Sequence, residues 1–312
     1  MIELSLQTGE FVDVLGADRA YSLLKKYGFS CVDWNFDLCW NKKTVVKGPY
    51  EGQCIFERPL NEVLEYFSED LAAQKRYGIR PGQAHAPYPA YAPGYPDFSP
   101  YARKIYGRCI EFCDAVGIPY LVIHGISRMY NEDLSEDAVD ELNWELYSGL
   151  IPVLQKTNVT VCLENLFTRS FRNGLHAGFG SDAKKAAQLI DRLNEAAGKE
   201  CFGFCLDTGH LTLVRLDFRS FIPALGNRIK CLHLNDNDQS GDHHRVPYGG
   251  LADWERFYSE MRKVDYRGTV NFETHKQYSL DTLYDPDFIE PWLAYLAVCG
   301  RMMGQRMGLK DK

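Results

Sequence analysis

The segment that decides the fold contains two short apolar runs, each ending in residues of the metal-ligand types. The first is Cys201-Phe-Gly-Phe-Cys-Leu-Asp-Thr-Gly-His210, and the second is Ile229-Lys-Cys-Leu-His-Leu-Asn-Asp236. Short runs of Val, Ile, Leu, Phe and Cys bounded by turn residues are typical of strands buried on both faces, as in a parallel sheet. We therefore expect the carboxylates and imidazoles at their ends to lie at a rim of the sheet rather than in its core.

The same unit recurs along the chain: a short apolar strand, a polar or Gly/Pro-containing loop, and an amphipathic helix. Eight strands are predicted to end near Leu6, Trp34, His85, His124, Glu164, Asp207, His233 and Glu273. Helices are predicted over residues 18–27, 60–77, 101–116, 137–155, 182–197, 218–225, 254–264 and 286–303. Asp182 and Asp253 are expected at helix starts, where their side chains accept hydrogen bonds from first-turn N–H groups.

Eight alternating strand–helix units predict an α/β fold in the form of a single (β/α)8 TIM barrel, with residues 1–312 as one domain. An open doubly wound sheet is the weaker alternative, because no Gly-rich phosphate loop follows the first strand. Longer connections over residues 36–57, 87–100 and 168–180 follow strand ends, where such a barrel carries its active-site loops. The second, rich in Tyr and Pro, predicts a stiff aromatic wall or lid, with an oligomer contact as the alternative.

Composition narrows the range of partners. The 312 residues carry a net charge of −7 and are 45% hydrophobic. That balance argues against a broad surface for nucleic acid or anionic membrane. With no signal-peptide pattern and no long apolar run, we expect a cytoplasmic protein that binds neither nucleic acid nor membrane. Most of the ten cysteines fall inside apolar runs and are expected to be buried thiols.

Histidines and acids cluster at the predicted strand ends. Seven of the eight histidines lie there: His85, His124, His210, His233, His243, His244 and His275. So do Glu164, Asp207 and Glu273. Three carboxylates meeting at one rim would repel one another, and a divalent metal with His233 as a fourth ligand removes that repulsion. The alternatives are salt bridges for the acids and hydrogen-bonded core positions for His85 and His124.

An ordered series of short motifs resembles the xylose isomerase-like barrel superfamily, and most closely its sugar phosphate isomerase/epimerase branch. The motifs are His85-Ala-Pro, His124-Gly, Leu163-Glu-Asn165, Leu206-Asp-Thr-Gly-His210, His233-Leu-Asn-Asp-Asn237, Asp242-His-His244, Gly249-Gly250 with Asp253-Trp254, and Phe272-Glu273. The series spans nearly the whole chain.

This resemblance, which extends to the tagatose epimerase-type enzymes, implies one divalent metal ion and a sugar or sugar phosphate substrate. The implied ligands are Glu164, Asp207, His233 and Glu273, and their donor atoms suit Mn2+, Co2+, Mg2+ or Zn2+. The two glutamates become the catalytic acid/base pair. His210 becomes a substrate contact, and a homodimer or homotetramer is implied. If the two glutamates transfer protons at both faces of one carbon, the enzyme is a ketose epimerase. If proton transfer occurs at one face only, it is an aldose–ketose isomerase.

Further contacts with the substrate are expected from the other strand-end residues. His85 and His124 are candidates for its hydroxyl groups. Basic residues that could hold a phosphate or carboxylate are Arg128, Arg169, Arg172, Arg245 and Lys276, of which Arg245 is preferred because it follows Asp242-His-His244 directly.

A second resemblance competes, to the endonuclease IV type of abasic-site nuclease, which implies up to three Zn2+ ions. The additional metal ligands would then be His85, His124, His210, Asp242 and His244. The acidic net charge argues against this multi-zinc phosphodiesterase. So does the segment Asn165-Leu-Phe-Thr-Arg-Ser-Phe-Arg172, which is not the small, Gly-rich sequence expected there. A non-catalytic sugar-binding barrel ranks third, since no ligand of the single-metal set is missing.

Overall fold

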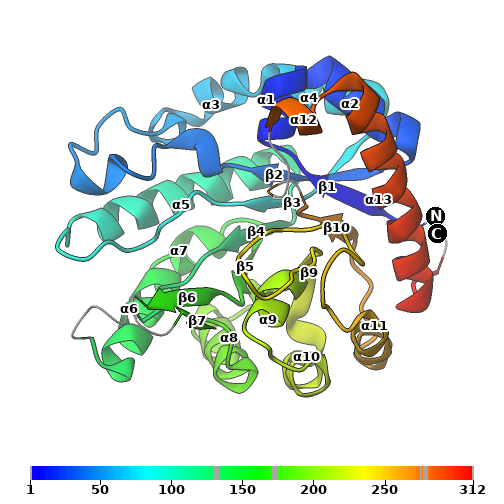
Figure 1. The fold of residues 1–312 in the computed structure, drawn as a ribbon. Coiled ribbons are helices and arrows are strands. Elements are labelled where there is room, and N and C mark those ends of the chain that lie inside the picture. The colour runs from blue at the N-terminus through cyan, green and yellow to red at the C-terminus, as the bar shows by residue number, and fades with distance from the viewer. Residues whose placement is uncertain (1, 129–133, 171–173, 275, 277–279, 311–312) are drawn as a thin grey trace. The chain divides into compact units, whose positions relative to one another are not determined.

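Strands and helices alternate along the chain as predicted (Figure 1). The computed structural model describes residues 2–128, 134–170, 174–274, 276 and 280–310. Its strands are β1 (Leu4–Gln7), β2 (Cys31–Asn35), β3 (Arg80–His85), β4 (Tyr120–Ile123), β5 (Thr160–Glu164), β6 (Phe167–Ser170), β7 (Gly174–Ala177), β8 (Phe202–Asp207), β9 (Ile229–His233) and β10 (Val270–Phe272).

The helices fill the connections between these strands. They are α1 (Glu10–Leu15), α2 (Ala17–Tyr27), α3 (Leu60–Tyr66), α4 (Ser68–Tyr77), α5 (Phe98–Val116), α6 (Glu136–Ser148), α7 (Ile151–Leu154), α8 (Ala183–Ala197), α9 (Thr208–Leu213), α10 (Phe218–Leu225), α11 (Trp254–Lys263), α12 (Leu280–Leu283) and α13 (Pro286–Arg306). Short 3-10 helices cover Asp37–Cys39, Val45–Lys47, Ile55–Glu57 and Gly226–Arg228.

The fold is the predicted (β/α)8 TIM barrel. The eight-stranded sheet has the order β10-β1-β2-β3-β4-β5-β8-β9. Each of its strands ends within one residue of the predicted position. By contact, the chain divides into two compact units: unit 1 is Met1–Trp34, Glu69–Gly82 and Cys205–Lys312, and unit 2 is Asn35–Ser68 and Gln83–Phe204. The expectation of one domain over residues 1–312 stays a prediction.

Unit 1 contains both ends of the sheet order. β1 pairs in parallel with β10 and with β2, while β9 continues into a bridge between Leu234 and Phe272 of β10. The first and last strands of the order therefore meet inside this unit, as closure of a barrel requires. α13 packs against β1, β10 and α2 (Figure 1). Its apolar face, including Leu293, Leu296 and Met303, is fully buried.

Unit 2 is built on the parallel strands β3, β4 and β5, with α5 packed against β4. Four phenylalanines form its aromatic core, in which neighbouring ring centroids lie 4.9–6.1 Å apart: Phe36, Phe56, Phe67 and Phe112. This cluster anchors the long connection after β2. The connection after β5, predicted to be one of the long active-site loops, contains the antiparallel hairpin β6–β7.

Two predicted helices are each split in the structure. The 60–77 helix divides at Phe67 into α3 and α4, and the 137–155 helix divides around Gly149 and Pro152 into α6 and α7. Pro152 lies in the first turn of α7, where the N–H that proline lacks would have no helical partner. Asp182 and Asp253 cap α8 and α11 through their side chains, as predicted.

The cysteines lie where their apolar sequence context predicts. All ten cysteines are free thiols, and nine are buried. Among the described residues, no helix combines the length and the apolar character that crossing a membrane requires.

Candidate functional site

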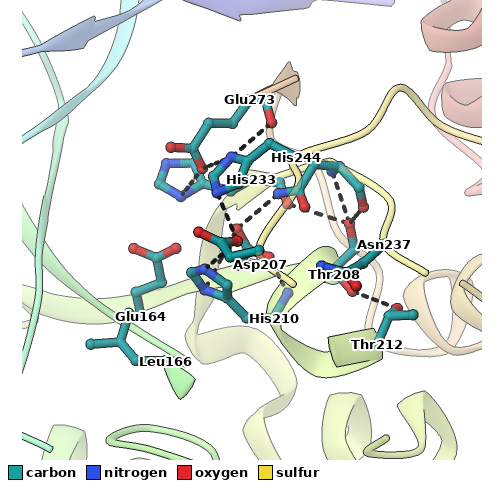
Figure 2. A network of polar contacts seen from close by, with 12 residues as sticks. Glu164, Leu166, Asp207, Thr208, His210, Thr212, His233, Asn237, His244 and Glu273 are labelled. Carbon is teal, nitrogen blue, oxygen red and sulfur yellow. Dashed lines mark hydrogen bonds and ion pairs between the residues drawn. The ribbon is translucent and has the colours of Figure 1, made fainter. Parts of the chain in front are cut away.

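Three of the predicted metal ligands meet in unit 1 at the ends of β8, β9 and β10. One ligand atom each from Asp207, His233 and Glu273 lies within 4.8 Å of the others, and all three side chains are buried (Figure 2). Two carboxylates and an imidazole at this spacing form a donor set that suits a divalent cation. Without a bound cation, burying two carboxylates so close together would carry a large cost in desolvation and repulsion.

Asp207 is fixed by the turn that follows β8. It is the N-cap of α9, and its Oδ1 accepts a 2.6 Å hydrogen bond from the His210 backbone N–H. Its Oδ2 accepts a 2.9 Å hydrogen bond from Asn235 Nδ2. A Cβ atom at Gly209 would lie only 1.6 Å from Asn235 Oδ1, so only glycine lets the amide come this close. The Asp-Thr-Gly-His sequence thus both caps a helix and orients a carboxylate.

His233 lies between two carboxylates. Its Nδ1 is 3.4 Å from Glu273 Oε2, and its Nε2 is 3.3 Å from Asp33 Oδ2. Asp33 is fully buried in β2, where Asn271 Nδ2 donates to the same oxygen at 2.9 Å. Metal-binding histidines commonly pair their second nitrogen with a carboxylate, which fixes the ring orientation. Asp33 occupies that supporting position here.

Glu273 is held by a buried amide from the neighbouring strand. Gln7, the last residue of β1, donates from Nε2 to Glu273 Oε1 at 2.9 Å. The other carboxylate oxygen, Oε2, is the one near His233. One oxygen of Glu273 is therefore fixed while the other faces the ligand cluster.

A second cluster in unit 1 contains His210, Asp242 and His244. Asp242 Oδ1 is 3.0 Å from His244 Nε2 and 3.5 Å from His210 Nε2 (Figure 2 labels both histidines). Lys276 Nζ lies 2.9 Å from Asp242 Oδ2 and 2.6 Å from His244 Nε2. Burial by itself would raise the pKa of Asp242, but its contacts with His210 and His244 outweigh burial and hold that pKa well below its ordinary value.

The site residues of unit 2 form a chain of contacts at the ends of β3, β4 and β5. His85 Nε2 is 3.0 Å from His124 Nε2, and His124 Nε2 is 3.0 Å from Glu164 Oε2. Burial lowers the pKa of His124, partly offset by the Glu164 carboxylate, so the neutral imidazole is favoured. The three ligand atoms also lie within 4.8 Å of one another.

Tyr88, from the Tyr- and Pro-rich connection over residues 87–100, lies beside His124. The Tyr88 ring stacks on His124 with centroids 4.9 Å apart, and Lys42 Nζ lies 3.4 Å from the Tyr88 ring centroid. Lys42 also pairs with Asp37 at 2.6 Å, and Trp40 Nε1 donates to the Tyr88 carbonyl at 2.9 Å. The loops after β2 and β3 thus hold Tyr88 in a defined orientation.

Other candidates lie apart from these clusters or outside the described residues. Arg245 NH2 pairs with Asp238 Oδ2 at 2.5 Å, and NH1 donates to the Gly249 carbonyl. His243 also contacts Asp238, at 3.1 Å. Arg172 and His275 fall outside the described residues.

Sequence reasoning missed the residues that support the ligands: Gln7, Asp33, Asn235 and Asn271. Each is buried. Gln7, Asp33 and Asn271 lie in strands whose other residues are mostly apolar, and Asn235 lies two residues after the end of β9. A polar side chain inside a strand buried on both faces was the available signal, since it requires a hydrogen-bonding partner.

The chain belongs to the xylose isomerase-like TIM barrel family, whose model matches residues 22–291. Among curated relatives, a probable endonuclease 4 from Nitrosopumilus maritimus is 30% identical over 190 residues, covering 54% of this chain and 62% of that protein. The chain spans about half to three-fifths of the length of the curated relatives it matches.

Solved structures share the fold at low sequence identity. The 3-keto-D-glucoside 4-epimerase YcjR from E. coli has a TM-score of 0.67 at 16% identity, covering 96% of this chain and 100% of that one. The IolI protein, solved with a bound zinc atom, has a TM-score of 0.63 at 13% identity, covering 98% of both chains. The solved structures that share the fold of this chain thus include a sugar epimerase and a zinc-bound barrel.

Proposed function

We propose that this protein is a divalent-metal-dependent isomerase or epimerase acting on a sugar or sugar phosphate. The observation that carries the proposal is the meeting of Asp207, His233 and Glu273, each fixed by a buried polar partner. In a TIM barrel the C-terminal strand ends share one rim. We therefore infer that Glu164, at the end of β5, completes a four-ligand set for one ion.

The chemistry of the donor set supports the choice of ion. Three carboxylates with one imidazole suit Mn2+, Co2+, Mg2+ or Zn2+, and the similarity to the zinc-bound IolI structure is consistent with this set. When bound, such an ion polarises the carbonyl and adjacent hydroxyl oxygens of a ketose, which makes the neighbouring C–H more acidic.

The protein's own contribution is proton transfer by Glu164 and Glu273. One carboxylate takes the proton from the carbon beside the carbonyl, and the other returns a proton to the opposite face, which inverts that centre. If the proton is instead returned to the former carbonyl carbon, and the proton of the neighbouring hydroxyl moves to the former carbonyl oxygen, the product is the isomeric aldose or ketose. Gln7 donates to Oε1 of Glu273, while Oε2 faces the ligand cluster.

The remaining strand-end histidines are proposed to bind the substrate. His85, His124 and His210 would contact its hydroxyl groups, and Tyr88 would form an apolar wall for the sugar carbons. Arg245 would contact a phosphate only after leaving Asp238, so we favour an unphosphorylated sugar. A homodimer or homotetramer remains part of the proposal.

The test is solvent exchange. The Mn2+- or Co2+-loaded protein is incubated with a panel of ketoses in D2O, and NMR follows deuterium at the carbon beside the carbonyl together with the new epimer or aldose. We expect exchange with at least one sugar, and a loss of about 10²–10⁴-fold in Glu164→Gln and Glu273→Gln. Metal-loaded protein that exchanges no ketose or ketose phosphate would contradict the proposal.

A multi-zinc phosphodiesterase is the second candidate, because His210, Asp242 and His244 also bring ligand atoms within 4.8 Å of one another. The 30% identity to a probable endonuclease 4 supports it. The net charge of −7 opposes binding to a DNA backbone. Cleavage of abasic-site DNA by the zinc-loaded protein, without ketose exchange, would favour this function.

A further inference from the structure

The second cluster of unit 1 already contains a cation from the protein itself. His210, Asp242 and His244 offer two imidazoles and a carboxylate, a donor set that fits Zn2+. Yet Lys276 Nζ lies 2.6 Å from His244 Nε2 and 2.9 Å from Asp242 Oδ2. Two of the three donor groups therefore contact an ammonium at hydrogen-bond distance.

Lys276 and Asp242 contact the same ring nitrogen of His244. Nε2 lies 2.6 Å from Lys276 Nζ and 3.0 Å from Asp242 Oδ1. The other nitrogen, Nδ1, lies 3.1 Å from the Glu273 carbonyl oxygen. Both ring nitrogens are thus engaged, and the ammonium lies beside the Nε2 atom that a metal ion would need.

His244 has an uncommon backbone conformation. Its φ angle of 45° lies in the left-handed region, which non-glycine residues adopt uncommonly. His244 is buried, and Asp242 is largely buried. A divalent ion entering between them would have to displace the ammonium or remain a few ångströms from it, where the two positive charges repel.

We propose that Lys276 is a built-in cation that occupies the position of a second metal ion and keeps the centre mononuclear. The inference deepens the proposed function, on which its single-ion centre rests: Lys276 disfavours the clustered-metal chemistry of a phosphodiesterase. It also neutralises Asp242 without adding a Lewis acid, which leaves His210 to contact substrate.

The experiment measures Co2+ and Zn2+ stoichiometry by equilibrium dialysis and plasma mass spectrometry, with circular dichroism to verify folding. Wild type is expected to bind one ion per chain even in excess metal. Lys276→Gln and Lys276→Met should bind a second ion, seen also as an additional Co2+ d–d absorption. Lys276→Arg, which keeps the charge, should bind one. Lys42→Gln, which removes a lysine from unit 2, is the matched control and should bind one.

Adding Asp242→Asn to Lys276→Gln should return the stoichiometry to one, because the second ion loses its carboxylate. Two ions in wild type, or no gain in Lys276→Gln and Lys276→Met, would overturn the proposal. The gain of one ion is independent of the first site: no ion in wild type and one in Lys276→Gln would refute the proposed single-metal centre while supporting the role of Lys276.

Discussion

The two units prepare their candidate site residues in different ways. In unit 1, Asp207, His233 and Glu273 are each held by a separate buried polar group, namely Asn235, Asp33 and Gln7. In unit 2, His85, His124 and Glu164 contact one another in a chain, and an aromatic ring covers His124. Independently fixed ligands keep their geometry when an ion enters or leaves. Groups that contact one another can exchange those contacts for a substrate's hydroxyls.

The largest effect should come from removing a ligand in unit 1. Asp207→Ala is expected to weaken Mn2+ or Zn2+ binding by more than about 100-fold, the upper range for residues that only support a ligand. Activity should be lost with the metal. Calorimetric titration measures the affinity for the metal ion. His85→Ala, in unit 2, is the matched control variant. An equal loss in His85→Ala would show that the two clusters do not differ as described.

Next in size is the removal of a supporting group. Asn235→Ala removes the amide that donates to Asp207 and should weaken metal binding by about 10–100-fold. Asn143, a buried amide of unit 2, is the control because it bonds only to backbone groups of Ile126 and Val139 in the described structure. Asn143→Ala should lower the melting temperature by several degrees with unchanged metal affinity. Unchanged affinity in Asn235→Ala would contradict the supporting role.

A smaller effect is expected for the imidazole chain of unit 2. His124→Gln should lower kcat/KM for the responsive sugar by about 10-fold, roughly the loss of one hydrogen bond to a neutral partner. Metal stoichiometry should stay at the wild-type value. A fall in the number of metal ions bound per chain would instead identify His124 as a metal ligand, as the phosphodiesterase alternative requires.

The smallest effect should follow from Lys42→Met. Its ammonium lies over the Tyr88 ring, a contact worth about 0.5–1 kcal/mol at an exposed site, so KM should rise only about 2–5-fold. Initial-rate kinetics measure it, with kcat as the internal reference. A large fall in kcat would place Lys42 in the chemistry itself.

The sequence was sufficient for the fold and for the residues at the strand ends. Strand ends were predictable where a polar residue ends a buried apolar run, as Asp207 ends β8 and His233 ends β9. The supporting contacts were not predictable, because Gln7 and Glu273 are 266 positions apart and Asn271 and Asp33 are 238 apart. Which strands become neighbours, and in which register, decides those pairs.

Local competition explains the elements that were missed. The β6–β7 hairpin lies in a segment whose β7 strand is partly or fully exposed, so no buried apolar periodicity marked it. Asp207 is the N-cap of α9, and the six residues of this helix are too few to show a helical periodicity of apolar residues. The role proposed for Lys276 depends on the turn that brings His244 close to Asp242. The sequence analysis listed Lys276 with the other basic residues, and nothing in that list distinguished it from Arg245.

The ten free cysteines have a practical consequence for spectroscopy. Nine thiols are buried, and burial raises the pKa of Cys54 to about 12, so few of them present a thiolate to a reagent. Cys39 is the partly accessible exception, and its neighbour Trp40 donates to the Tyr88 carbonyl. A maleimide fluorophore would therefore attach selectively at Cys39 in the native protein. Under the proposed function, it would report on sugar binding beside Tyr88 without any engineered cysteine.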